Sequence, residues 1–228
     1  MEQQKKIISL KLSTLSVAKV AMLLALYLVS DLIPISPVIG SGGKFISLRI
    51  ILAPVIAYIL NPSEALVLSI ILIPFKYKFP PFSFLQPLVE IGLGNLIFHF
   101  TPVGGIVAFI FLVIISVDYL ITNFLFPFYP SLHLAAAFIA LFLCIVHKRL
   151  STQVKIPLSC YVITMCSHGI IMPFFIHIIP LPWETWIIIL PMTAFERSSS
   201  VIGSTLIIFA IMRVFPRIRY LRVREDFN

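Results

Sequence analysis

Long runs of apolar residues, interrupted by proline, glycine and charged residues, make up most of this chain. Eight such segments cover roughly residues 12–33, 45–60, 64–75, 84–100, 103–126, 131–147, 156–179 and 184–213. The run 106–115 is apolar at every position, whereas strands of a membrane barrel alternate apolar and polar residues, so the pattern predicts helices. A helix needs about 20 residues to cross the hydrocarbon core. The shorter segments 64–75 and 84–100 are therefore predicted to be half-helices or a re-entrant pair, which leaves six to eight spanning segments.

The composition excludes a soluble globular protein. Of the 228 residues, 60% are hydrophobic and only 11% are charged, and the mean hydropathy is +1.07. A chain of this size has too little interior to bury so much apolar surface, so most of it must face lipid. We predict an all-α, polytopic helical bundle in the cell membrane. Residues 1–213 are expected to form one transmembrane domain, followed by a short basic cytoplasmic tail, 214–228.

Basic residues lie at the ends of the apolar segments. The net charge is +8 and the isoelectric point is near 9.6, but the sequence does not concentrate this charge on a folded basic face for nucleic acid. Lysines and arginines gather within 5–19, 148–155 and 213–224, which predicts that these regions are cytoplasmic. Because the number of segments is even, both termini are predicted to be cytoplasmic. The C-terminal cluster also suits contact with anionic membrane lipids.

Ionisable residues within or beside the apolar segments are the candidate substrate-binding residues. Even lenient insertion scales put Asp, Lys or Arg at about +2.5 to +3.5 kcal/mol in the middle of the membrane, so such residues need partners, water or a ligand. In the eight-segment topology Arg49, Glu90, Asp118 and Glu196 all map to the outer half of the membrane or its outer edge. Their position predicts an outward-facing polar pocket. The alternative is that some of them are interfacial residues that reach into water.

Two local patterns strengthen the candidates Glu90 and Glu196. Gln86, Glu90 and Gly94 are each one helical turn apart, which would place an amide, a carboxylate and a glycine on one face as a ligand wall. Glu196 and Arg197 are adjacent charges in a serine- and glycine-rich stretch, so on a helix they point in different directions. The alternative explanation of this stretch is helix packing through small residues.

No metal, cofactor or catalytic activity is expected from the sequence. The three cysteines lie in apolar runs without a CxxC pattern, and the five histidines form neither an HxxH nor an HExxH pair. The sequence has no Walker A motif, so ATP-driven activity would require partner proteins.

A stripe of small residues runs along the first segment. Ala18, Ala21 and Ala25 recur at i, i+3 and i+7, and the spacing of Ala21 and Ala25 lets another helix approach closely. Packing inside this protein is one explanation. A glycine-rich outer loop at 38–45, the stretch 46–54 ending in Ala-Pro, and a break at Asn61-Pro62 follow in order.

In this order of features, over about residues 12–125, the chain resembles the substrate-binding S-components of energy-coupling factor (ECF) vitamin transporters. The resemblance implies a small membrane protein that captures a vitamin or similar small molecule from outside. It also implies that Ala18, Ala21 and Ala25 dock on a transmembrane coupling protein driven by two ATPase subunits, and that 41–49 closes over the substrate. Two features differ from that family: Asn61-Pro62 replaces Gly-Pro, and eight apolar segments exceed its six.

The leading functional hypothesis is therefore substrate capture for an ATP-driven uptake system, without enzymatic activity. The alternative is a secondary carrier in which Glu90, Asp118 or Glu196 titrates as an ion-coupling group. An integral membrane enzyme that modifies lipids is the third hypothesis. The abundant aromatic residues, which include 20 Phe and 7 Tyr, could stack on a heterocyclic ligand but are equally ordinary in lipid-facing surfaces.

Overall fold

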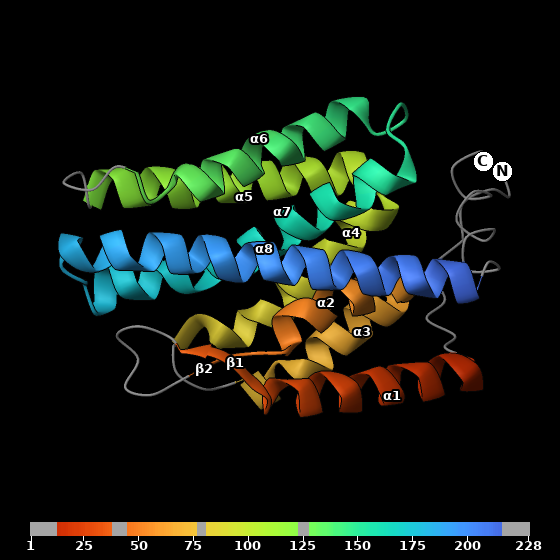
Figure 1. Ribbon diagram of the computed structural model, residues 1–228. Coiled ribbons are helices and arrows are strands. Elements are labelled where there is room, and N and C mark those ends of the chain that lie inside the picture. Colours follow the sequence, from red (N-terminus) through yellow and green to blue (C-terminus); the bar gives the residue numbers. More distant parts are fainter. Residues whose placement is uncertain (1–12, 38–44, 77–80, 123–127, 216–228) are drawn as a thin grey trace, which may run out of the picture.

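The computed structural model describes residues 13–37, 45–76, 81–122 and 128–215, and these form a bundle of helices (Figure 1). Within these described ranges, four helices are long and apolar enough to cross a membrane, by length and composition. They are α1 (Thr14–Asp31), α5 (Thr101–Thr122), α7 (Thr152–Pro173, continued by the π-helical turn η4, Phe174–Ile178) and α8 (Trp183–Val214). Four of the predicted apolar segments thus correspond to full-length helices.

The remaining helices are shorter. They are α2 (Arg49–Ile59), α3 (Pro62–Leu72), α4 (Gly94–His99) and α6 (Ser131–Val146), with the short turns η1 (Pro74–Lys76), η2 (Pro81–Leu85) and η3 (Leu88–Leu93). The 11-residue α3 is about half of what a membrane crossing needs. The segment 84–100 comprises the end of η2, the π-helical η3 and α4, and η3 runs directly into α4. Whether it forms a re-entrant pair with 64–75 stays a prediction.

A two-stranded hairpin departs from the all-helical prediction. Strands β1 (Pro34–Pro37) and β2 (Phe45–Ser47) pair antiparallel, with Pro34 opposite Ser47 and Pro37 opposite Phe45. The hairpin lies between α1 and α2 at one end of the bundle (Figure 1). It brings the start of α2 back to the end of α1, which positions the charged residues described below.

Helix α2 is attached to its neighbours through side chains that bond its backbone. Pro54 lacks an N–H group, so the carbonyl of Ile50 loses its usual helical donor. Ser200 on α8 donates to this carbonyl at 2.7 Å, and Ser204 donates to the Ile51 carbonyl at 2.7 Å. The neighbouring helix thus satisfies a polar group that lipid could not.

Close helix contacts depend on glycine in the α4–α5–α6 region. A Cβ atom at Gly104 would lie 2.4 Å from the backbone nitrogen of Ile97 on α4, and one at Gly105 would lie 2.8 Å from the carbonyl oxygen of Ala140 on α6. Small residues let helix backbones approach in this way. The buried core includes Ala108, Ala136, Ala137, Ala140 and Leu143. Large apolar side chains such as Leu15, Ile121 and Phe195 are exposed instead, as expected for a lipid-facing surface.

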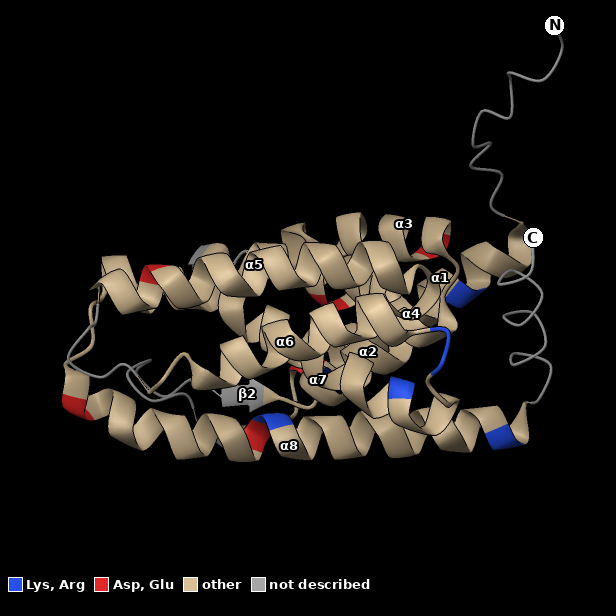
Figure 2. Cartoon of the chain, turned by 90° about the horizontal axis from the view of Figure 1, so that it is seen from above, with Lys and Arg blue, Asp and Glu red and all other residues tan. Residues whose placement is uncertain are grey.

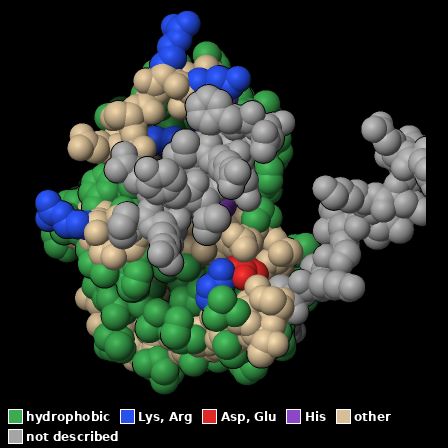
Figure 3. All heavy atoms as spheres, turned by 90° about the vertical axis from the view of Figure 1, so that its right-hand side faces the viewer, with side chains coloured by type: hydrophobic (Ala, Val, Ile, Leu, Met, Phe, Trp, Pro, Cys, Tyr) green, Lys and Arg blue, Asp and Glu red, His purple; other side chains and the backbone are tan. Residues whose placement is uncertain are grey.

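The two ends of the bundle differ in charge. Helix α1 begins and α8 ends at the same end (Figure 1). Most of the basic residues gather there (Figure 2), whereas Asp118, near the end of α5, and Glu184, near the start of α8, lie toward the opposite end. The basic residues at this end include Lys19, Lys148, Arg149, Lys155 and Arg213, and Lys and Arg side chains project from it when it is viewed end-on (Figure 3). We call these the basic end and the acidic end; by the positive-inside tendency the basic end is the one expected to face the cytoplasm.

Candidate functional site

Arg49 is the centre of a buried hydrogen-bonded network, which we call the Arg49 network. It is the first residue of α2, directly after the hairpin, and its side chain is 9% exposed. Its guanidinium donates from Nη1 to the hydroxyl oxygen of Tyr27 at 3.0 Å and to Glu90 Oε2 at 3.2 Å. Nη2 donates to Gln86 at 3.1 Å, and Nε lies 3.1 Å from Asp31 Oδ1. Residues from α1, α2 and the 86–90 segment therefore converge on one cation.

Glu90 is the most deeply buried carboxylate of this network, with 1% of the residue exposed. In addition to Arg49, it accepts hydrogen bonds from the Tyr27 hydroxyl at 2.7 Å and from the Ser167 hydroxyl on α7 at 2.5 Å. Three donors, from α1, α2 and α7, thus surround one carboxylate. Ser167 extends the network from the α1–α2 side of the bundle to α7.

Asp31 and Lys76 complete the charge balance of the Arg49 network. Asp31 accepts a hydrogen bond from Ser47 at 2.9 Å and forms ion pairs with both Arg49 and Lys76. Two cations, Arg49 and Lys76, therefore face two carboxylates, Asp31 and Glu90. Burial, reinforced by the nearby Arg49 guanidinium, lowers the pKa of Lys76 to about 8. The site can thus hold a polar group without carrying a large net charge.

A second polar cluster lies between α6, α7 and α8, and we call it the histidine cluster. Nδ1 of His168 lies 3.1 Å from Nε2 of His133, and the two rings are nearly parallel with centroids 5.1 Å apart. The Tyr129 hydroxyl lies 3.3 Å from the other nitrogen of His168. Arg197 lies within electrostatic range of all three side chains, and Glu196 acts on Arg197 in turn. Both residues of the Glu196–Arg197 pair are buried midway along α8 (Figure 2).

The structure brings some of the predicted site residues together and separates others. Arg49 and Glu90 are direct partners. Glu196 belongs to the neighbouring histidine cluster and has interactions of its own. Asp118 lies apart from them at the acidic end, where its carboxylate is 2.9 Å from Nε2 of a half-exposed His177. Asp118 is thus a rim residue in an ion pair rather than part of the Arg49 network. Of the predicted closing segment 41–49, residues 41–44 lie outside the described residues.

Sequence reasoning missed several members of both clusters. Tyr27 was missed, although it lies one helical turn before the ionisable Asp31 on α1, a spacing that was available as a signal. Ser167 carried no signal in an apolar helix. The pair of His133 and His168 is 35 residues apart in sequence, so local motifs could not detect it.

The predicted docking residues Ala18, Ala21 and Ala25 are exposed on α1. The buried face of α1 consists of Val20, Leu23, Tyr27 and Ser30, and the alanine stripe lies outside it. Within the described residues, the stripe is therefore not a surface of internal packing.

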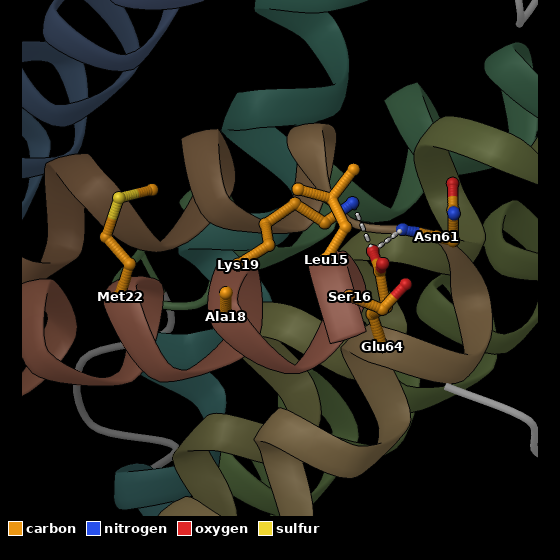
Figure 4. Close-up of a pocket in the computed structure, with 7 residues that line it drawn as sticks. All are labelled: Leu15, Ser16, Ala18, Lys19, Met22, Asn61 and Glu64. Carbon is orange, nitrogen blue, oxygen red and sulfur yellow. Dashed lines mark hydrogen bonds and ion pairs between the residues drawn. The ribbon is translucent and has the colours of Figure 1, made fainter. Parts of the chain in front are cut away.

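A groove of about 490 Å³ lies beside this stripe at the basic end, between α1 and the start of α3 (Figure 4). Ala18 and Met22 line it on α1, and the ion pair of Lys19 with Glu64 crosses it at 2.5 Å. Glu64 also accepts from the backbone N–H of Asn61 at 2.9 Å, which fixes the first turn of α3. The lining of the groove thus combines apolar side chains with the ion pair of Lys19 and Glu64.

Within the described ranges, the structure shows no cluster of three or more His, Cys, Asp or Glu side chains arranged to hold a metal ion. Comparison with known proteins finds no protein-family model, curated protein or solved structure that matches this chain.

Proposed function

We propose that this protein is the substrate-capture component of an ATP-driven uptake system of the energy-coupling factor type, located in the cell membrane with both termini in the cytoplasm. The observation that carries the proposal is the exposed alanine stripe of α1, since a stripe used only for internal packing would be buried. In the proposed system it docks on a transmembrane coupling protein powered by two ATPase subunits. The resemblance in the order of sequence features supplies this partner.

The Arg49 network supports the substrate-binding half of the proposal. Buried ionisable groups are costly in a membrane protein and mark functional sites. Arg49, which contacts Glu90, directly follows the hairpin, and strand β2 of the hairpin belongs to the segment 41–49 that is expected to close over the substrate. A small molecule is then captured from the side of the acidic end and released when the partner reshapes the bundle.

The groove between α1 and α3 supports docking at the basic end. Its lining includes Ala18 of the stripe, and its ion pair of Lys19 and Glu64 holds α1 against α3. A partner helix seated along the stripe would reach this groove. Movement of the partner would therefore act on α3, which packs against η3, the element that carries Glu90.

Affinity purification from the native membrane followed by native mass spectrometry tests this function. We expect a bound small molecule together with a transmembrane partner and two ATPase subunits. Uptake into vesicles should then require ATP inside. Uptake by the isolated chain that follows a proton or ion gradient, without ATPase partners, would instead establish the secondary carrier. Chemical conversion of a lipid would establish the enzyme.

A further inference from the structure

Arg197 is an incompletely satisfied cation in the interior of the bundle. It lies midway along α8, is 4% exposed, and shares its buried face with Thr193 and Ser200. Its Nη1 donates to the Thr164 carbonyl of α7 at 3.4 Å, which is a long bond, and its buried Nε has no hydrogen-bond partner. Buried polar groups in native proteins are almost always paired, so an unpaired guanidinium donor needs an explanation.

The neighbours of Arg197 do not supply the missing hydrogen-bond acceptor. Glu196 and Glu90 lie within electrostatic range and offset its charge, but Glu90 already accepts from three other donors. His133 and His168 face each other at 3.1 Å, a geometry in which one ring nitrogen donates to the lone pair of the other. The two imidazoles therefore bond each other, and the Nε–H of Arg197 remains without an acceptor.

Aromatic rings continue from Arg197 toward the acidic end. The Tyr129 ring lies 4.6 Å from that of Trp186 and 5.3 Å from that of Tyr119, measured between centroids. Trp186 Nε1 and the Tyr119 hydroxyl are also buried without hydrogen-bond partners. Arg197 and Trp186 are eleven residues apart on α8, or about 16 Å along its axis. Unpaired buried donors thus occur on both sides of Tyr129 in a cluster of packed aromatic rings.

We propose that Arg197 binds the carboxylate of the captured molecule, whose planar or apolar remainder lies toward Tyr129. This inference rests on the proposed function and names the class of its substrate, a carboxylic acid. A carboxylate supplies the acceptors that the guanidinium lacks, and Arg binds carboxylates with paired N–H donors. The aromatic rings favour a flat remainder because stacked rings add to the affinity of apolar burial.

Benzoate is a suitable probe because it joins a carboxylate to a flat ring, and benzamide is its neutral counterpart of the same shape. The affinities of both are measured for the purified full chain in detergent micelles by calorimetric titration. We expect benzoate to bind more tightly than benzamide. A charge-assisted hydrogen bond implies that Arg197→Gln weakens benzoate binding by about tenfold to a hundredfold and abolishes the preference. Arg213→Gln, an exposed arginine on the same helix, should leave both affinities unchanged.

Thermal unfolding of the ligand-free variants separates a binding role from a structural one. Arg197→Gln should melt near the wild-type temperature, because the guanidinium makes one long hydrogen bond to Thr164 and glutamine keeps a side-chain donor at this position. Loss of the fold in Arg197→Gln would mean that Arg197 is structural and would overturn the proposal. Equal affinity for benzoate and benzamide, no benzoate binding, or unchanged benzoate binding in Arg197→Gln would overturn it as well. Binding of inorganic phosphate in place of benzoate would reject the carboxylate class.

Failure of this inference is distinguishable from failure of the proposed function. If a small molecule co-purifies with the chain and ATPase partners drive its uptake, capture stands whatever Arg197 does. If the carboxylate preference depends on Arg197 but uptake needs no ATPase, the subsite stands and the ECF assignment fails.

Discussion

Replacing Glu90 with glutamine tests whether the Arg49 network is held by charge balance. In the native chain Asp31 and Glu90 offset Arg49 and Lys76, so Glu90→Gln leaves one uncompensated positive charge in a buried region. Removing one partner of a buried ion pair costs about 3–5 kcal/mol. Because glutamine keeps the shape and one acceptor oxygen, we expect the lower end, a loss of about 3 kcal/mol in the free energy of unfolding.

The double variant makes the reasoning sharper. Arg49→Gln alone leaves one excess negative charge, whereas Arg49→Gln with Glu90→Gln restores the balance of Asp31 and Lys76. The double variant should therefore lose less stability than the sum of the two single losses, by at least about 1 kcal/mol. Unfolding by sodium dodecyl sulfate in mixed micelles, followed by circular dichroism, measures all three.

Asp118→Asn provides the matched control for this cycle. Its ion pair with His177 is partly exposed to solvent, so its removal should cost less than about 1 kcal/mol. The charge-balance argument is refuted if Glu90→Gln costs no more than Asp118→Asn, or if the losses of the single variants simply add in the double variant.

Three further predictions concern docking, packing and pH. Ala21→Trp and Ala25→Trp should abolish ATP-dependent uptake in vesicles but change ligand affinity and stability little, since both positions are exposed on α1; a loss of ligand affinity would contradict a docking role. Gly104→Ala should destabilise the chain by about 1–3 kcal/mol or more in a thermal melt, because its Cβ would clash with the backbone of α4, whereas Gly92→Ala meets only ordinary contacts and should be tolerated. Lys76 has a pKa of about 8 in the folded chain against 10.5 for a free lysine. Between these values the folded state binds fewer protons than the unfolded state, so stability should rise from about pH 8 to pH 10.5. A melt series with Lys76→Met should lack this rise, and an identical rise in that variant would exclude Lys76 as its source.

Most helices were predictable because uninterrupted apolar runs indicate helices in a membrane protein. The predicted segment 131–147 corresponds to α6 at Ser131–Val146, and 12–33 corresponds to α1 at Thr14–Asp31. The hairpin was not predicted, because β1 is only four residues long and has proline at both ends, which argues against a strand. Its pairing with Phe45–Ser47 depends on the packing around it.

The candidate site was predictable in its residue types but not in its pairings. The cost of charges in an apolar segment singled out Arg49, Glu90 and Glu196, and all three are buried. Arg49 and Glu90 are 41 residues apart, so their contact depends on the tertiary fold and leaves no local sequence pattern. The same cost argument selected Asp118, whose position near the end of α5 instead lets it reach solvent beside His177. The position of each helix within the bundle decides whether a charged residue is buried or reaches solvent, and the sequence does not give this position.

The bonds that attach α2 to its neighbours constrain the two sides unequally over evolutionary time. Ser200 and Ser204 bond the carbonyls of Ile50 and Ile51, and Asn95 bonds carbonyls at the end of α2. A carbonyl is present whatever the residue, so these bonds do not fix the residue types at positions 50, 51, 57 and 60. The donor positions are restricted, because a replacement must also carry a side-chain hydrogen-bond donor, such as a hydroxyl or an amide. Divergent descendants of this chain should therefore keep three scattered polar positions, at 95, 200 and 204, while the residues whose carbonyls they bond change among apolar types.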